Sequence, residues 1–185
     1  MDLKQVNDTL NTYIRPQTFS VAIKLFTAQE ALPAKVKIPV KDLGYQIALC
    51  QAWGLSRRYG WTVAVGKDDQ CCIGGHVAMG FMDNPPQIGS GDAENRHESG
   101  TYAYMASAPI DRADFEPDMI CLYVNSAQAM RLAQSAVNGG GGYRAHVCDR
   151  YGQLRRRCGA NDLNGSEPVY TPFRGKQNLR FHSGP

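Results

Sequence analysis

Apolar residues near the start of the chain recur every three or four positions, the period of one face of an α-helix. They predict a short amphipathic helix that stops at Arg15-Pro16, because proline disfavours the helical conformation in the residue before it. A second helix is predicted at about 43–59, and a third at 126–140 with Ser126 as its N-cap. One face of the second helix is expected to carry Leu43, Ile47, Cys50 and Gly54. The buried face of the third is expected to comprise Ala127, Met130, Ala133 and Val137.

Short apolar runs that lack the helical period predict strands between these helices. The predicted strands are 19–26, 61–66, 118–125 and 143–149. Residues 84–101 are rich in proline, glycine and polar side chains, the composition of an exposed loop. This loop is the candidate for a lid.

The surroundings of the second and third predicted helices resemble each other. Each helix follows a strand and precedes one, and the triplet Cys50-Gln51-Ala52 is echoed by Ala127-Gln128-Ala129, 77 positions later. Two half-repeats, about 18–82 and 117–149, would each be a β-α-β unit, although so short an echo also arises by chance. The pattern favours an α/β fold with a mixed sheet flanked by helices, and α+β remains the alternative. Residues 1–143 are expected to form one domain.

Charge is distributed unevenly around a net value of +3 in 185 residues. The segment 144–185 is expected to be an irregular or divergent basic tail, and its longest basic run, Arg155 to Arg157, falls short of a nucleic-acid-binding patch. We therefore expect no nucleic-acid partner. The start of the chain has no signal-peptide core and no stretch is apolar enough to span a membrane, so a cytoplasmic location is expected. In a reducing compartment the six cysteines would be free thiols or metal ligands.

The stretch KDDQCCIGGHVAMG, residues 67–80, contains the strongest candidate chemistry. Cys72 and His76 are four positions apart, so on a helix they share a face and could bind one metal ion, with Cys71, Cys50 or Asp69 completing the ligand set. The cysteines could instead be small packed residues at a crowded turn, or redox-active thiols. No paired C-x-x-C motif supports a zinc site.

Four further residues are candidates for contact with a ligand. Gly74 and Gly75 would let a backbone approach an anion, or they simply permit a turn. Gln51 and Gln128 would occupy equivalent positions in the two half-repeats. Each glutamine either bonds neighbouring backbone or faces a ligand in a cleft between the halves.

Several stretches together resemble one known family. They are YIRPQTFSVAIKLF, CQAWGLSRRYGWTVAVGKDDQCCIGGHVAMGF and PDMICLYVNSAQAMRLAQSAVNGGGGY. These stretches, which cover roughly residues 10–143, resemble the uncharacterised ArCR family, also called domain of unknown function 169. Two features depart from the family: Ser20 stands where a proline is usual, and the chain after Gly142 no longer looks like it. The resemblance implies a domain without an assigned activity, from archaea and anaerobic bacteria.

The sequence leaves three classes of function open. The first is a soluble domain that binds a metal, a cofactor or a small molecule at a cleft lined by cysteine, histidine and glutamine, with a thiolate-bound metal as the candidate cofactor. The second is a thiol-dependent redox or transfer enzyme, and the third is a non-catalytic assembly subunit, with a protein partner or a homo-oligomer implied. Hydrolytic motifs such as a nucleophile elbow or H-E-x-x-H are absent from the sequence.

Overall fold

The computed structural model describes residues 2–83, 96–138, 170–172 and 178–180. The predicted strand at 143–149, most of the predicted loop and most of the basic tail lie outside these residues. In chain order the helices are α1 (Leu3–Tyr13), η1 (Pro39–Leu43), α2 (Leu49–Tyr59), α3 (Ile73–Ala78) and α4 (Ser126–Asn138). The strands are β1 (Val21–Phe26), β2 (Val63–Gly66), β3 (Tyr104–Pro109), β4 (Met119–Cys121), β5 (Tyr170–Pro172) and β6 (Asn178–Arg180).

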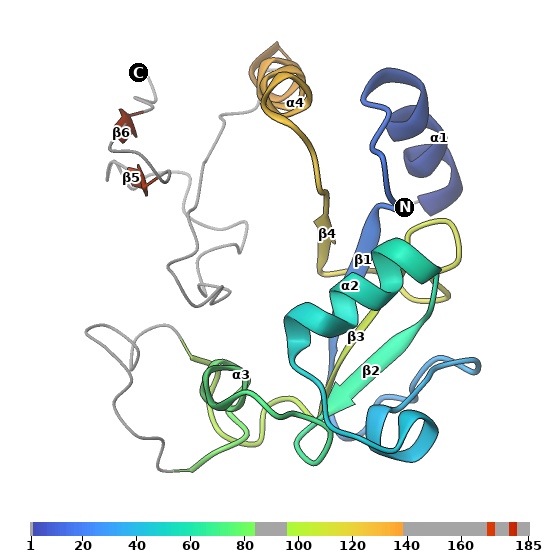
Figure 1. Cartoon of the computed structure of the whole chain (residues 1–185), viewed down its shortest axis with the longest axis vertical. Coiled ribbons are helices and arrows are strands. Elements are labelled where there is room, and N and C mark those ends of the chain that lie inside the picture. The colour runs from blue at the N-terminus through green and yellow to red at the C-terminus, as the bar shows by residue number, and fades with distance from the viewer. Residues whose placement is uncertain (1, 84–95, 139–169, 173–177, 181–185) are drawn as a thin grey trace.

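Four strands form one sheet in the order β2-β3-β1-β4, and every ladder in it is antiparallel (Figure 1). Strands β1 and β2 run in the same direction, as a β-α-β unit requires, but β3 lies between them and pairs with both. Parallel pairing is limited in the described residues to two isolated bridges, Lys37 to Val63 and Ile47 to Gln70. Helices with a four-stranded sheet agree with the predicted α/β or α+β class, whereas the expected mixed sheet is antiparallel in its ladders.

The sequence prediction omitted β3, although it is a central strand. Residues 104–109 read YMASAP, which contains no valine, isoleucine or threonine, the residues most typical of strands. Small side chains at Ala106, Ser107 and Ala108 are fully buried here, because layers close on both faces of the sheet. Burial from both sides therefore makes this segment a strand despite its weak local preference.

The predicted boundaries of the second helix were wrong at its start. The helix begins at Leu49, and the preceding residues 39–43 form the short π-helix η1, which ends at Gly44 with a left-handed φ of 81°. Ile47 cannot join α2 because its N–H donates to Asp69 O and its carbonyl accepts from Cys71 N. Of the predicted helix face, Ile47 is buried through this bridge, and Cys50 lies on the exposed side of α2.

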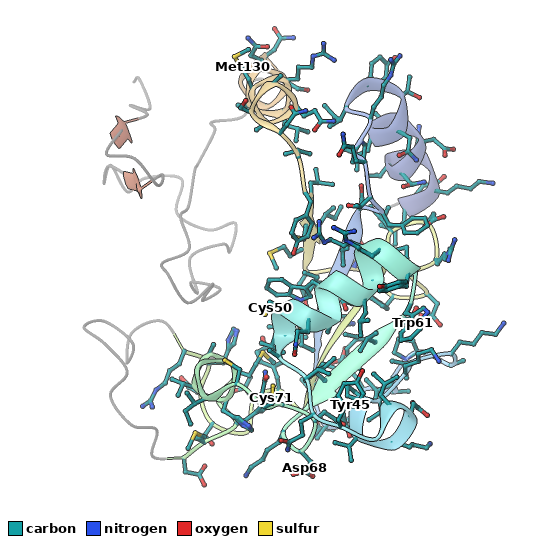
Figure 2. The ribbon with its side chains drawn as sticks, in the orientation of Figure 1. Tyr45, Cys50, Trp61, Asp68, Cys71 and Met130 are labelled. Atoms are coloured by element: carbon teal, nitrogen blue, oxygen red, sulfur yellow. The ribbon has the colours of Figure 1, made fainter. Side chains whose placement is uncertain are left out.

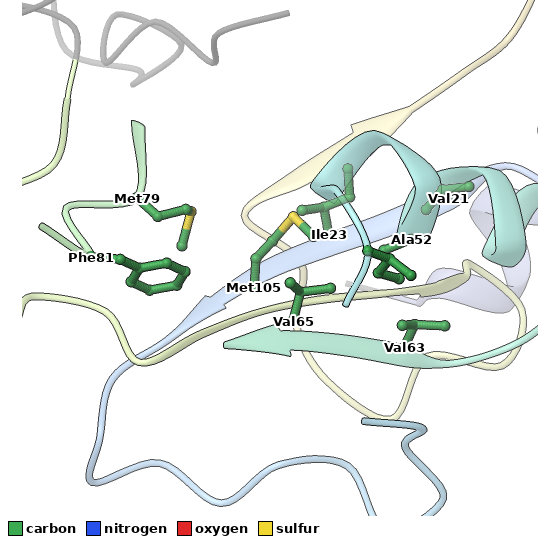
Figure 3. Packing of buried hydrophobic residues seen from close by; sticks show 9 residues of the cluster. Val21, Ile23, Ala52, Val63, Val65, Met79, Phe81 and Met105 are labelled. Atoms are coloured by element: carbon green, nitrogen blue, oxygen red, sulfur yellow. The ribbon is translucent and has the colours of Figure 1, made fainter. Parts of the chain in front are cut away.

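The main core lies between α2 and the face of the sheet that carries Ile23 and Met105 (Figure 3). Its buried residues come from β1, β2, β3, α2, the segment between η1 and α2, and the segment after α3: Val21, Ile23, Ile47, Ala52, Val63, Val65, Met79, Phe81 and Met105. Burying each of the larger side chains contributes about 1.5–3 kcal/mol. Small residues on α2 allow the close approach, and Ser56 Oγ donates to Ser107 O at 3.1 Å.

Helix α4 differs from its prediction in the face that it buries. Ala127 and Met130 are exposed, Met130 at 58%, and Ala133 is half-buried. Figure 1 shows α4 beyond the end of β4 and away from α2, so the sheet does not cover the predicted apolar face. The side chain of Val137 lies outside the described residues.

Candidate functional site

The turn after β2 fixes the backbone that carries the candidate thiols. Asp69 is buried at 5% exposure, and its carboxylate accepts from Val40 N at 3.0 Å and from Gly66 N at 3.1 Å. The Ile47 bridge holds the same turn from the other side, since Cys71 N donates to Ile47 O at 3.2 Å. Asp69 is thus a backbone acceptor that fixes the turn. Asp68 is exposed beside it.

Gln70 lies inside this turn and both cysteines point out of it. Its side chain is 1% exposed, Oε1 accepts from Cys72 N at 3.1 Å, and Nε2 has no hydrogen-bond partner among the described residues. Cys71 and Cys72 are exposed free thiols (Figure 2 labels Cys71). The two thiols are therefore not packed inside the turn.

His76 follows one turn later on α3. Its Nε2 lies 2.9 Å from Gln70 O, and its ring packs edge-on against Phe81 with centroids 6.0 Å apart. When the neutral ring donates from Nε2, Nδ1 carries the lone pair, and a carbonyl partner of this kind is common for histidines that bind metals. The half-buried ring is therefore held in one tautomer.

The complete metal-ligand set expected from the sequence is not assembled. Among the described residues, no group of three or more histidine, cysteine, aspartate or glutamate side chains could hold a metal ion. Cys50 is exposed on the first turn of α2, on a separate element from Cys71, Cys72 and His76. What the turn does offer is a pair of adjacent soft ligands.

Gln51 and Gln128 occupy the same local position at the starts of α2 and α4. Gln51 Oε1 accepts from Ala48 N at 2.7 Å, and Gln128 Oε1 accepts from Asn125 N at 2.9 Å. Each is the third residue of its helix and satisfies a backbone N–H before it, as in a capping box. Gln128 Nε2 also donates to Ile14 O at 2.9 Å and Arg15 O at 2.8 Å, which ties α4 to the end of α1. Both amides thus bond backbone, one of the two roles that the sequence left open.

The two candidate glycines differ in their surroundings. A β carbon on Gly74 would meet only Cys72 Sγ, at 3.8 Å, whereas one on Gly75 would overlap the Gln70 amide. Gly75 is therefore required by packing against Gln70. Gly74 leaves room beside the Cys72 thiol.

A second cluster, which sequence reasoning missed, connects α2 with the residues after β4. The Arg57 guanidinium lies 3.9 Å from the centroid of the Tyr123 ring. Burial, and then the neighbouring Cys121 thiol, raises the pKa of the Tyr123 hydroxyl, while Arg57 opposes that shift and Cys50 adds to it. The sequence did contain a clue to this cluster. In an extended chain every second residue faces the same side, so Met119, Cys121 and Tyr123 are expected to share one face.

A hollow of about 400 Å³ lies elsewhere, between the start of α1 and the segment after β3. It is lined by Asp2, Leu3, Lys4, Ile110, Asp111, Ala113, Asp114, Phe115 and Glu116. None of the predicted site residues lines it. The candidate thiols are therefore a surface feature of the turn after β2.

A family model for uncharacterised ArCR proteins, domain of unknown function 169, matches residues 9–148. The chain belongs to this family. The match confirms the resemblance and extends it slightly beyond residues 10–143. No curated protein and no solved structure matches the chain. In the part of the chain that the structure describes, no helix is long and apolar enough to cross a membrane.

Proposed function

We propose that this ArCR domain binds a thiophilic metal ion, or a small ligand containing one, through Cys71 and Cys72. The supporting observation is that two adjacent thiols are exposed on a backbone that hydrogen bonds hold on both sides. Cys71 is anchored through Ile47, and Cys72 through the buried side chain of Gln70. A rigid backbone lowers the conformational cost of presenting both sulfurs to one ion.

Two thiolates provide a soft ligand pair that suits copper(I) or zinc better than magnesium or calcium. Copper(I) accepts low coordination numbers, so a thiolate pair leaves positions for groups supplied by the ligand. His76 is four residues from Cys72, and its Nδ1, the ring nitrogen that carries the lone pair, is the nitrogen ligand closest in sequence. The proposed site is thus an open one, in which the protein supplies part of the coordination shell.

Anaerobic titration of the reduced protein with copper(I), against a chromogenic chelator, tests this proposal. One equivalent should bind and produce a thiolate-to-metal charge-transfer absorption in the near ultraviolet. Cys71→Ser and Cys72→Ser should each remove that band, while Cys50→Ser, on a separate element, should keep it. Equal loss in all three variants, or a band that survives both substitutions in the turn, would contradict the proposal.

A thiol-dependent redox or transfer role is the second candidate. It is supported by the open space next to Cys72, where Gly74 contributes no side chain and the sulfur is exposed. Alkylation of single-cysteine variants at graded pH would reveal a thiolate at neutral pH, as this chemistry requires. If Cys72 reacts no faster than Cys50 at pH 7 and no copper band forms, both roles of the turn are excluded.

A further inference from the structure

Aromatic and cationic side chains from four separate segments meet around Gly60, at the connection between α2 and β2. We call this set the Gly60 surface. It consists of Phe19, Lys37, Tyr59, Trp61 and Arg112. Gly60 has a left-handed φ of 71°, and a β carbon there would overlap Arg112 Nη1 and lie 3.4 Å from Phe19 Cε2. The glycine therefore brings the two sides of the surface into contact.

Both cations of this surface are positioned by aromatic rings. Lys37 Nζ lies 4.9 Å from the centroid of Trp61, and the Arg112 guanidinium lies 4.9 Å from that of Phe19. Arg112 Nη1 also donates to Gly60 O at 3.3 Å. Cation–π contact orders these side chains before any partner arrives, so less entropy is lost on binding.

The aromatic side chains remain accessible. Tyr59 is 65% exposed and Phe19 37% exposed, and the rings of Tyr59 and Trp61 lie 5.9 Å apart at 41°. Figure 2 shows Trp61 at the edge of the molecule where α2 meets β2, on a different element from the thiols of the Cys71 turn. Exposed apolar side chains that cluster, unlike those scattered singly, are a feature of interaction sites.

The charge of the surface favours an anionic partner. The surface carries the cations Lys37 and Arg112, and the carboxylate Oδ2 of Asp111 lies 3.9 Å from Arg112 Nε. Exposed π faces next to ordered cations are the elements that single-stranded nucleic acids use, because bases stack on rings and phosphates meet the cations. A protein partner would require a larger apolar core than three rings supply.

We propose that the Gly60 surface binds single-stranded nucleic acid, with bases stacked on Tyr59 and phosphates at Lys37 and Arg112. The sequence analysis predicted no nucleic-acid partner because it considered only runs of consecutive basic residues. Here the cations come from positions 37 and 112, and only the fold brings them together. The proposal is independent of the thiol site.

Fluorescence anisotropy with a labelled oligothymidine at low salt tests the inference. Saturable binding is expected, with affinity falling as salt rises because two phosphates are neutralised, which gives a log–log slope of about −1.4. Tyr59→Ala should weaken binding about five-fold or more, since one stacked base is lost. Tyr59→Phe should bind like the parent, and Lys37→Gln with Arg112→Gln should flatten the salt dependence.

Tyr45→Ala and Lys41→Gln are matched controls, because both residues are exposed but lie on or next to η1. They should leave the affinity unchanged. The inference is overturned if no saturable binding occurs, or if Tyr59→Ala binds like the parent. It is equally overturned if replacing Arg155, Arg156 and Arg157 with glutamine abolishes binding while the Gly60-surface variants retain it.

Discussion

Gly75 packs against the buried amide of Gln70 so closely that a β carbon at position 75 would overlap Gln70 Nε2. Gln70 cannot simply move away, because its Oε1 accepts from Cys72 N and the side chain is 1% exposed. Gly75→Ala should therefore destabilise the protein by about 1–3 kcal/mol, as overpacking does. Chemical denaturation measures the change.

Gly74→Ala is the matched control for that substitution. A β carbon there would contact only Sγ of Cys72, the N-cap residue of α3, at 3.8 Å. Since alanine is favoured over glycine in a helix by about 0.8–1 kcal/mol, this variant should be equally or more stable than the parent. Similar losses in both variants would show that α3, and not the Gln70 contact, sets the requirement for glycine.

Asp69 and Asp68 are adjacent carboxylates with different expected sensitivities. Asp69→Asn replaces one carboxylate oxygen by an NH₂ group that must face a backbone N–H, at Val40 or Gly66. Hydrogen bonds to a charged acceptor contribute about 1.5–3 kcal/mol, so a loss of that order is expected in urea unfolding. Asp68→Asn, at an exposed site, should change the free energy of unfolding by less than about 0.5 kcal/mol.

Gln128 is expected to couple α4 to α1, unlike its counterpart Gln51. Gln128→Glu keeps an acceptor for Asn125 N but removes the donor to Ile14 O and Arg15 O. Amide hydrogen exchange should therefore accelerate in α4 and at the end of α1. Gln51→Glu keeps its cap acceptor and should leave exchange in both helices unchanged. Unchanged exchange in Gln128→Glu would mean that the two amide bonds do not hold α4.

Tyr123 should titrate above the usual value for tyrosine, near 10. Burial is the main cause of its raised pKa, with the Cys121 thiol next. A raised pKa means that the folded state favours the neutral phenol, so this contribution to stability is present below pH 10 and is lost as pH rises through the folded-state pKa. The tyrosinate absorption difference between the parent and Tyr123→Phe measures it. Arg57→Gln should raise that pKa further, because the Arg57 charge lowers it.

Glu30 should titrate far below the usual range for glutamate. The backbone N–H of Thr27 is the largest cause, followed by Lys24 and the Thr27 hydroxyl, and together they lower the pKa of Glu30 from 4.5 to about 2. The carboxylate therefore contributes stability above pH 4.5, and that contribution is lost as pH falls through about 2. NMR titration of its side-chain carboxyl carbon checks the value. Lys24→Gln should reverse only part of the shift, and because Glu30 is exposed, salt should do the same.

Local signals predicted α1 and the position of α4 well. The residue that caps α4, however, is Asn125, whose Oδ1 accepts from Gln128 N, whereas the predicted cap Ser126 is the first residue of the helix. The period of α1 and its stop at Arg15-Pro16 agree with a helix at Leu3–Tyr13 followed by Arg15 at a φ of 56°. The start of α4 follows from Asn125 and Gln128, which bond each other's backbone N–H groups. These features depend on residues within four positions of each other, so sequence spacing is sufficient to predict them.

The prediction failed where distant segments decide the outcome. The start of α2 was placed too early because Ile47 fits the helical period, yet its backbone pairs with the turn at Asp69 and Cys71. β3 was omitted because its composition is unlike that of a strand. Its identity comes from burial between β1 and β2.

The sequence by itself determined which segments are amphipathic, the start of α4 to within one residue, and that adjacent thiols follow an acidic pair. Only the tertiary structure decided that both thiols face solvent, that Tyr123 lies beneath Arg57, and that Lys37 and Arg112 lie on aromatic rings around Gly60. The physical reason is the separation along the chain of the residues that interact. Helical periods and caps join neighbours in the chain, whereas exposure and ring contacts depend on which distant segments the core brings together.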